Sequence, residues 1–272
     1  MAAQSTPAAE RRPAAARGDQ PLVSICDLNV DFAGVRAISN LSLDIAEGSV
    51  CGLIGPNGAG KTTLFNCITR TVRPKSGTIA YAGESLLSHR ASDLASLGIR
   101  RTFQNLALFP SMDVRTNVMT GAHSQGRAGW ARATVRVGMR AEERRLARAA
   151  DDALELLGLQ LVARHRVTEL PFGTLKRVEL ARAVVSRPRL LLLDEPANGL
   201  RESEVDELAG VINGIRSELN LTMIVVEHHV GLVMRLSDSV AAMASGSMIT
   251  HGEPESVRKH PDVMRVFLGE AV

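Results

Sequence analysis

The sequence predicts an α/β fold, and three observations support this assignment. Short apolar or β-branched runs bounded by Gly, Asn or Asp alternate with stretches of helical periodicity along most of the 272 residues. The run Leu190–Leu193 is apolar at every position, which is typical of a strand buried on both faces of a parallel sheet. The motif Gly55–Thr62 lies between a predicted strand and a predicted helix, where α/β proteins bind phosphates.

The expected elements follow in order along the chain. In the first half, strands are predicted at 22–31, 41–46 and 49–54, then a helix after Gly60, a hairpin strand at 78–81 and an apolar-basic run at 98–103. In the second half, helices are predicted at 141–157, 174–186 and 202–219, and strands at 190–193, 221–226 and 239–247. The middle, 105–175, is therefore expected to be a mostly helical subdomain within one domain spanning 21–272.

Composition excludes several classes of protein. Hydrophobic residues make up 45% and charged residues 22%, the balance of a globular chain rather than of a disordered one. No stretch approaches the roughly 18 uninterrupted apolar residues of a membrane-spanning helix. Residues 1–20 are rich in Ala, Pro, Arg and Gln and lack the apolar run of about 7–15 residues that a secretory signal needs. We expect them to form a disordered tail.

Net charge and cysteine content exclude further classes of protein. A net charge of +3 over the whole chain does not indicate a nucleic-acid-binding protein. The three cysteines, Cys26, Cys51 and Cys67, lack C-x-x-C spacing, so they predict neither a disulfide framework nor a zinc site. A reducing compartment is the expected location.

The motif Gly55–Thr62 fits the pattern G-x-x-x-x-G-K-[ST] of phosphate-binding loops. Its glycines let successive backbone N–H groups turn inward at the positive end of a helix, which makes a site for phosphate. Lys61 is expected to reach the terminal phosphates, and the Thr62 hydroxyl to hold magnesium. The predicted nucleotide-binding residues of this segment are Gly55, Asn57, Gly58, Gly60, Lys61, Thr62 and Thr63.

Two acidic residues follow the buried strand 190–193. Asp194 and Glu195 stand at its carboxyl end, where open α/β sheets bind their ligands. We expect Asp194 to steady the magnesium ion and Glu195 to take a proton from an attacking water. The phosphate-binding loop alone is compatible with a kinase, a GTPase, a helicase or a transport ATPase. Glu195 favours hydrolysis over transfer of phosphate to a small molecule.

Further motifs identify a family. The run Leu170–Ala183 (LPFGTLKRVELARA), just before the acidic strand, resembles the signature region of ABC transporter ATPases. Arg101–Asn105 (RTFQN) with Leu108–Pro110 (LFP), then Glu227–His229 (EHH) and Val266–Glu270 (VFLGE), look like the ATPases of branched-chain amino acid uptake systems. The resemblance covers residues 22–270, and the long helical middle is more like the larger of the two ATPases in such systems. It implies an ABC-type nucleotide-binding domain with a mixed sheet and an inserted helical subdomain.

The resemblance also implies roles for four single residues. Gln104 is expected to contact magnesium or water and to couple the site to a permease. His228 is expected to bond the terminal phosphate and to hold water and Glu195 in register. Phe32 matches the aromatic residue that stacks on adenine, and Gly173 lies where the signature meets the nucleotide of a partner subunit. The implied metal ligands are Thr62, Gln104 and Asp194, with Glu195, His228 and Gln104 as the catalytic set.

The cofactors implied are ATP and Mg²⁺, and the implied activity is ATP hydrolysis coupled to import of branched-chain or related amino acids. The expected partners are transmembrane permease subunits, a second ATPase that is the same or a related chain, and, indirectly, a solute-binding protein. No nucleic acid is expected. The chain is expected at the cytoplasmic face of the cell membrane as a peripheral subunit. The alternative is a soluble ABC-type ATPase that acts as a mechanical clamp on nucleic acid or ribosomes.

Three positions depart from the common pattern of the family. Pro171 stands where many members have a hydroxyl or a small residue. Because proline has no backbone N–H and no hydroxyl, it cannot donate a hydrogen bond to a phosphate. Arg201 replaces an acidic residue, and His229 replaces an aspartate. These departures bear on communication across a dimer more than on nucleotide binding.

Overall fold

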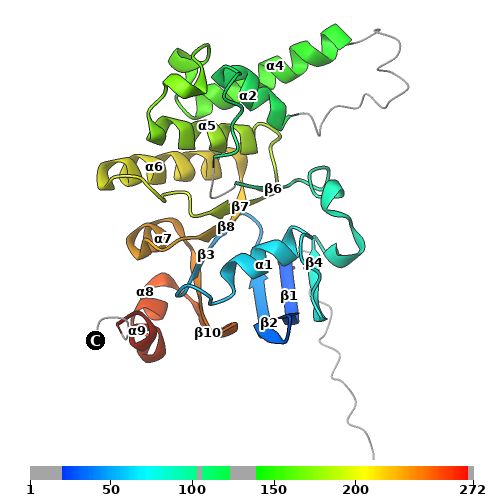
Figure 1. Cartoon of the computed structure of the whole chain (residues 1–272), viewed down its shortest axis with the longest axis vertical. Coiled ribbons are helices and arrows are strands. Elements are labelled where there is room, and N and C mark those ends of the chain that lie inside the picture. The colour runs from blue at the N-terminus through cyan, green and yellow to red at the C-terminus, as the bar shows by residue number, and fades with distance from the viewer. Residues whose placement is uncertain (1–19, 103–105, 123–138, 269–272) are drawn as a thin grey trace, which may run out of the picture.

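The computed structural model describes residues 20–102, 106–122 and 139–268 (Figure 1). Its larger sheet has six strands in the order β10-β9-β3-β8-β7-β6. The strands are β3 (Val50–Ile54), β6 (Ile99–Arg101), β7 (Leu190–Asp194), β8 (Thr222–Val226), β9 (Ser239–Ala244) and β10 (Ser247–Gly252). All neighbours in this sheet pair in parallel except β9 and β10, which are antiparallel. The sheet is therefore mixed, as the family resemblance implies.

The smaller sheet is antiparallel, with four strands in the order β2-β1-β4-β5. They are β1 (Val23–Phe32), β2 (Val35–Ile45), β4 (Ser76–Tyr81) and β5 (Glu84–Ser85). A two-residue turn, Ala33–Gly34, joins β1 to β2, and both residues have positive φ, as tight hairpin turns require. Phe32 pairs with Val35 across this turn, so the hairpin carries Phe32 at its tip.

The helix α1 (Lys61–Ile68) is enclosed between the two sheets. Its buried side chains Leu64, Phe65 and Ile68 belong to one hydrophobic cluster that also includes Ile25 of the small sheet and Leu53 of the large one. Packing against both sheets fixes the orientation of this helix and thus the direction of its N-terminus.

The opposite face of the large sheet is covered by helices. These are α5 (Phe172–Val184), α6 (Glu202–Leu219) and α7 (Val230–Leu236). Within β7, Leu191 and Leu193 pack into this helical cluster, whereas Leu190 and Leu192 pack into the cluster around α1. The prediction that this strand is buried on both faces is confirmed.

A group of helices lies at one end of the molecule, at the top of Figure 1. It comprises α2 (Val114–Gly121) and α4 (Met139–Leu156), which pack on each other and on α5. Arg115 of α2 holds Asp151 of α4 through two hydrogen bonds of 2.6 and 2.7 Å. Short 3₁₀ turns lie at Leu86–Ser88, Ala91–Asp93, Gln160–Val162 and Val167–Glu169. At the C-terminal end, α8 (Pro254–Arg258) and α9 (Pro261–Leu268) pack near β9 and β10.

The predicted α/β class is confirmed, and most predicted elements lie within a few residues of the observed ones. The helix predicted at 202–219 has those same bounds. The sequence did not predict α2, α7, α8, α9 or β10. In the part of the chain that the structure describes, no helix combines the length and apolar character needed to cross a bilayer. The tail predicted at 1–20 falls, apart from residue 20, outside the described residues. The subdomain boundaries at 105–175 stay a prediction.

Candidate active site

The phosphate-binding loop connects β3 to α1, as the motif predicts. Gly60 precedes α1 with φ +101°, and a Cβ atom there would lie 2.7 Å from the carbonyl oxygen of Ala37. Only glycine fits that backbone without displacing the neighbouring strand. Asn57 and Gly58 are exposed at the rim of the loop, and Gly55 is buried at its start. The backbone is thus shaped for a bound anion next to the N-terminus of α1.

Lys61 is the first residue of α1 and is buried, although it carries a charge. Its Nζ donates hydrogen bonds to the carbonyl oxygens of Gly55, at 2.6 Å, and Pro56, at 3.0 Å. Burial lowers the pKa of Lys61, and the negative charges of Glu195 and Asp194 oppose this effect. Both carboxylates therefore favour the charged form of this lysine.

Asp194 is the last residue of β7, and its side chain is almost fully buried. Its Oδ2 accepts a hydrogen bond of 2.6 Å from Arg101, at the end of the adjacent strand β6. The same guanidinium donates to Oδ1 of Asn66 on α1 at 2.8 Å and lies 5.5 Å from the ring centre of Phe65. Arg101 therefore connects the acidic strand end to the helix that follows the phosphate-binding loop.

Glu195 leaves the sheet in a left-handed backbone conformation, with φ +48°. Its N–H donates to the carbonyl of Val226 on β8 at 2.8 Å, which holds the two strand ends together. Its Oε1 lies 2.9 Å from Nε2 of His228, and its Oε2 accepts a hydrogen bond from Asn198 at 3.2 Å. A predicted general base and a predicted phosphate-binding histidine are thus in direct contact.

The residues fit a magnesium ion that is held mainly by nucleotide phosphates and water. Across the described ranges, the structure contains no group of three or more His, Cys, Asp or Glu side chains that could hold a metal. Magnesium in nucleotide sites usually takes only one or two protein ligands and keeps several waters. Thr62, exposed in the first turn of α1, and Asp194, at the end of β7, would supply oxygen ligands of that kind. Thr63 follows on α1 and is half-buried.

Two predicted residues, Phe32 and Gly173, belong to other parts of the fold, and a third cannot be placed. Gln104 is outside the described residues, which resume two positions after it. Phe32 stands at the tip of the β1–β2 hairpin with 46% of its surface exposed. Gly173 is in the first turn of α5, on the face of the large sheet opposite to α1. Gly173 therefore does not adjoin the phosphate-binding loop of its own chain.

The three unusual positions have local structural roles. His229 caps α7, because its Nδ1 accepts the N–H of Leu232 at 3.2 Å. Arg201 precedes α6, and its N–H donates to Oε2 of Glu204 at 2.9 Å. Pro171 precedes α5, where its missing N–H is not needed. Each of the three residues directly precedes a helix, where the fold accommodates it.

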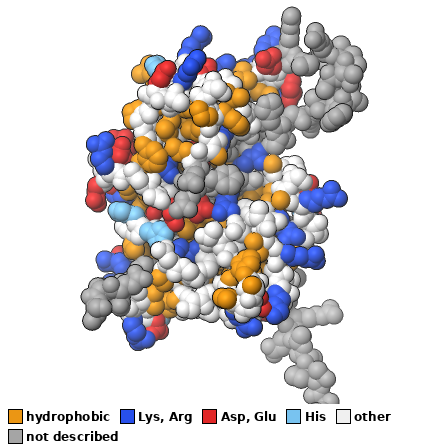
Figure 2. All heavy atoms as spheres, viewed as in Figure 1, with side chains coloured by type: hydrophobic (Ala, Val, Ile, Leu, Met, Phe, Trp, Pro, Cys, Tyr) orange, Lys and Arg blue, Asp and Glu red, His pale blue; other side chains and the backbone are white. Residues whose placement is uncertain are grey.

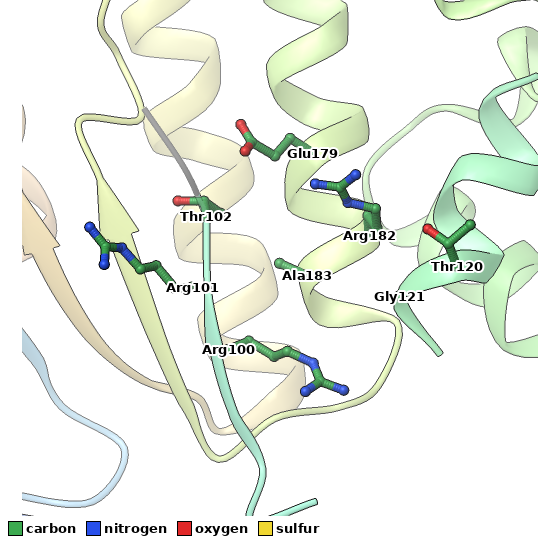
Figure 3. A pocket seen from close by; sticks show the side chains of 8 residues that line it. All are labelled: Arg100, Arg101, Thr102, Thr120, Gly121, Glu179, Arg182 and Ala183. Carbon is green, nitrogen blue, oxygen red and sulfur yellow. The ribbon is translucent and has the colours of Figure 1, made fainter. Parts of the chain in front are cut away.

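A cavity of 310 Å³ opens where β6, α2 and α5 meet (Figure 3). Arg100 and Arg101 point to opposite sides of β6 in this view, and Glu179 and Arg182 extend from α5 toward the end of the strand. Burial lowers the pKa of both Arg100 and Arg182. Thr102, which lines the cavity, directly precedes the segment that contains Gln104.

Sequence reasoning did not assign two residues that the structure places at the site. Arg101 belongs to the RTFQN motif, but nothing in its spacing indicates that its partner is Asp194, 93 residues later. Glu227 is only 3% exposed and accepts hydrogen bonds from the backbone of Ala197, His228 and His229. The signal for Glu227 is an acidic residue directly after a buried strand that is apolar at all but one position.

Comparison with known proteins agrees with this geometry. A family model described as ABC transporter matches residues 38–198, more than half of the chain. The chain is 39% identical to the high-affinity branched-chain amino acid transport ATP-binding protein LivG of Escherichia coli, over 93% of this chain and 99% of that protein. It is 36% identical to the corresponding protein BraF of Pseudomonas aeruginosa, with the same coverage.

Solved structures give the same result. The ADP-bound ATP-binding cassette MJ1267 superposes with a TM-score of 0.79 at 26% identity, covering 91% of this chain and 98% of that one. The protein cbiO1 of Clostridium perfringens, part of the transporter complex cbiONQ, superposes with a TM-score of 0.78 at 27% identity, covering 92% and 95%. With its sheet order, its phosphate-binding loop and its signature helix, the chain belongs to the ABC transporter ATP-binding family and is an ATPase.

Proposed function

We propose that the chain is the ATP-hydrolysing subunit of a membrane importer for branched-chain or related amino acids. The observation that carries the hydrolytic part is the 2.9 Å contact between Glu195 and His228, beside carboxylate charges that act on Lys61. The proposed solute is inferred from the relatives LivG and BraF, which are named as branched-chain amino acid transport proteins.

Each residue of the site has a distinct task in this proposal. Lys61 releases its own loop carbonyls and binds the terminal phosphates of ATP. Glu195 takes the proton of the attacking water. His228, held against Glu195, contacts the terminal phosphate and keeps base and phosphate at a fixed separation. Phe32, half-exposed at the hairpin tip, stacks on the adenine ring.

Thr62, Asp194 and Gln104 are the proposed holders of magnesium. When bound, the ion neutralises charge on the phosphate oxygens. The chain's own contribution is orientation, because Arg101 fixes Oδ2 of Asp194 by a hydrogen bond of 2.6 Å. The side chain of Asp194 therefore has a defined direction in which it would hold the ion.

A second ATPase subunit, the same or a related chain, completes the site in this proposal. Gly173 and the N-terminus of α5 lie on the opposite face of the sheet from α1, which supports contact with the nucleotide of a partner rather than with their own. Binding of ATP between two subunits closes the pair, and hydrolysis reopens it. This movement is the proposed drive for permease subunits, with the chain at the cytoplasmic face of the membrane.

The alternative, a soluble ATPase clamping nucleic acid or ribosomes, is not favoured. The relatives that match almost the whole chain are named as transport proteins. The net charge of +3 also gives no electrostatic reason to expect a polyanion as partner.

The catalytic assignment is tested by Glu195→Gln. This variant removes the base but retains the shape of the side chain, so ATP binding is expected to persist within about threefold while hydrolysis falls at least 100-fold, the usual lower bound for a positioned base. Glu143→Gln, an exposed change of the same kind on α4, is the matched control and keeps full activity. Rapid turnover by Glu195→Gln would show that another group is the base.

The transport assignment is tested by uptake of radiolabelled leucine, isoleucine and valine in cells of the source organism that lack the chain. We expect uptake to fall and to return with the intact chain but not with Lys61→Ala. Normal uptake in the deletion strain, together with co-sedimentation of the chain with ribosomes, would contradict the proposal and support the alternative.

A further inference from the structure

Glu227 is a buried carboxylate between two loops of the active site. It directly follows β8, and only 3% of its surface is exposed. Oε1 accepts the N–H of Ala197 at 2.6 Å. Oε2 accepts the N–H groups of His228, at 3.0 Å, and His229, at 3.3 Å. Both oxygens therefore bind backbone donors, and these donors come from segments about 30 residues apart in the sequence.

These contacts explain how a charged group is accommodated at this depth. Burying a carboxylate is costly unless hydrogen bonds replace its water. Backbone N–H donors to an ionised acceptor make short, strong bonds, and the 2.6 Å contact to Ala197 is of this kind. Glu227 thus bonds strongly to the backbone of both segments at the same time.

The two segments carry the proposed catalytic pair. Ala197 lies two residues after Glu195, and His228 is the residue next to Glu227. The side chains of Glu195 and His228 meet at 2.9 Å. Glu195 also has a left-handed backbone, with φ +48°, a conformation that the surrounding contacts must maintain. A carboxylate that holds both backbones therefore sets the separation of the two side chains.

We propose that Glu227 is a positioning residue for ATP hydrolysis, which joins the loop after β7 to the loop after β8 so that His228 meets Glu195. The inference rests on the proposed function, because the roles of Glu195 and His228 are assigned there. Glu227 itself is not expected to touch nucleotide, since its two oxygens are directed at backbone N–H groups.

Two substitutions test separately the charge and the length of the Glu227 side chain. Glu227→Gln has the same length, but its amide group presents N–H donors to one of the two loops, where donor would face donor. Glu227→Asp retains the carboxylate and is one methylene shorter, so it reaches one loop and not both. Glu218→Gln makes the same chemical change at an exposed position of α6 and serves as the matched control.

The experiment measures steady-state hydrolysis of Mg-ATP by the full chain and equilibrium binding of a fluorescent ATP analogue. For Glu227→Gln we expect kcat to fall at least about tenfold, a part of the 10²–10⁴-fold usually due to a positioned base, with KM and analogue affinity within about twofold. Glu227→Asp is expected between Glu227→Gln and the parent chain, and Glu218→Gln is expected to match the parent.

Amide hydrogen exchange gives a second readout. We expect faster exchange in peptides covering 195–199 and 227–230 of Glu227→Gln, with unchanged exchange in α1 at 61–68. If Glu227→Gln does not fold, the same two measurements on Glu227→Asp decide the question. Exchange that rises throughout the chain, or a fall in kcat matched by an equal loss of affinity, would indicate general destabilisation and overturn the proposal.

The outcomes distinguish this inference from the proposal on which it rests. If Glu195→Gln hydrolyses ATP normally, the proposed function fails and Glu227 loses its role with it. If Glu195→Gln is inactive but Glu227→Gln retains its kcat, the proposed function stands and only the inference about Glu227 is overturned.

Discussion

The ion pair between Arg101 and Asp194 is the main residue-scale feature that ties the acidic strand end to the phosphate-binding helix. Both side chains are mostly buried, 13% and 8% exposed, and the guanidinium also binds Asn66. Removing one partner of a buried pair leaves the other charge without compensation, which is more costly than losing a surface ion pair. The pair is therefore expected to matter for stability as well as for the direction of the carboxylate.

We predict that Arg101→Met lowers the free energy of unfolding of the nucleotide-free chain by about 2–4 kcal/mol. Adding Asp194→Asn removes the uncompensated charge, so the double variant should lose at least about 1 kcal/mol less than the sum of the two single variants. Urea denaturation followed by circular dichroism measures all three. Strict additivity would show that the two side chains do not stabilise each other.

At the scale of elements, α6 contains two glycines that the fold does not require. Gly210 and Gly214 are exposed in the interior of this helix, and a Cβ atom at either position would have no neighbour within 4 Å. Glycine in a helix interior is less favourable than alanine because it loses more backbone freedom on folding. The sequence of α6 is thus not optimal for stability.

The double substitution Gly210→Ala and Gly214→Ala is predicted to raise the free energy of unfolding by about 1–2 kcal/mol, with kcat unchanged within about twofold. Thermal or urea unfolding measures the gain. Gly121→Ala in α2 is the contrasting variant, since its Cβ would meet the backbone carbonyl of Arg182, and it should destabilise the chain. An unchanged free energy of unfolding in the α6 variant would contradict the view that these glycines destabilise the helix.

The elements that the sequence predicted well are those with a strong local pattern. The wholly apolar strand at 190–193 and the capped, periodic helix at 202–219 were located almost to the residue. By contrast, β2 begins at Val35 rather than at 41, because its first residues are held by pairing with β1 and not by their own apolar character. Short helices such as α7 and α8 form through tertiary packing, which local periodicity does not reveal.

The candidate site also contains parts that the sequence predicts and parts that it does not. The phosphate-binding loop and the acidic pair were predictable because their chemistry depends on residues that are adjacent in the sequence. The contacts of Arg101 with Asp194 and of Glu227 with Ala197 join residues far apart in the chain, so only the folded sheet brings them together. The functional roles of the predicted residues stay predictions.

At the scale of the whole molecule, the chain offers two different surfaces to a partner. The phosphate-binding loop is on one side of the large sheet and Gly173 on the other. Figure 2 shows hydrophobic side chains gathered on the upper part of the visible face, the region where α2 and α5 lie in Figure 1. If two copies pair as proposed, each nucleotide contacts the loop of one copy and Gly173 of the other.

Mixing two inactive variants tests this arrangement. Lys61→Ala damages the phosphate-binding loop, and Gly173→Asp damages the signature helix. A mixed dimer then contains one intact site, formed by Lys61 of one copy and Gly173 of the other. Random pairing puts half of the dimers in mixed form, so an equal mixture is expected to regain about a quarter of the parent ATPase activity if sites act independently.

The control mixture combines Lys61→Ala with Glu195→Gln. Both changes affect the residues around the same phosphate-binding loop, so no pairing of these two variants yields an intact site, and activity should stay at background. Recovery in the control, or its absence in the first mixture, would show that copies of this chain do not complete each other's sites.

The two hydrogen bonds that Lys61 makes to Gly55 and Pro56 have a consequence for the catalytic cycle. Two hydrogen bonds to its own loop already hold the ammonium group, so a nucleotide that binds Lys61 as proposed exchanges these bonds for others and does not simply add new ones. In the proposed cycle, the lysine returns to those carbonyls when product leaves. This exchange lowers the net affinity for nucleotide and favours release of the product. Such release is necessary for a subunit that binds and hydrolyses ATP repeatedly.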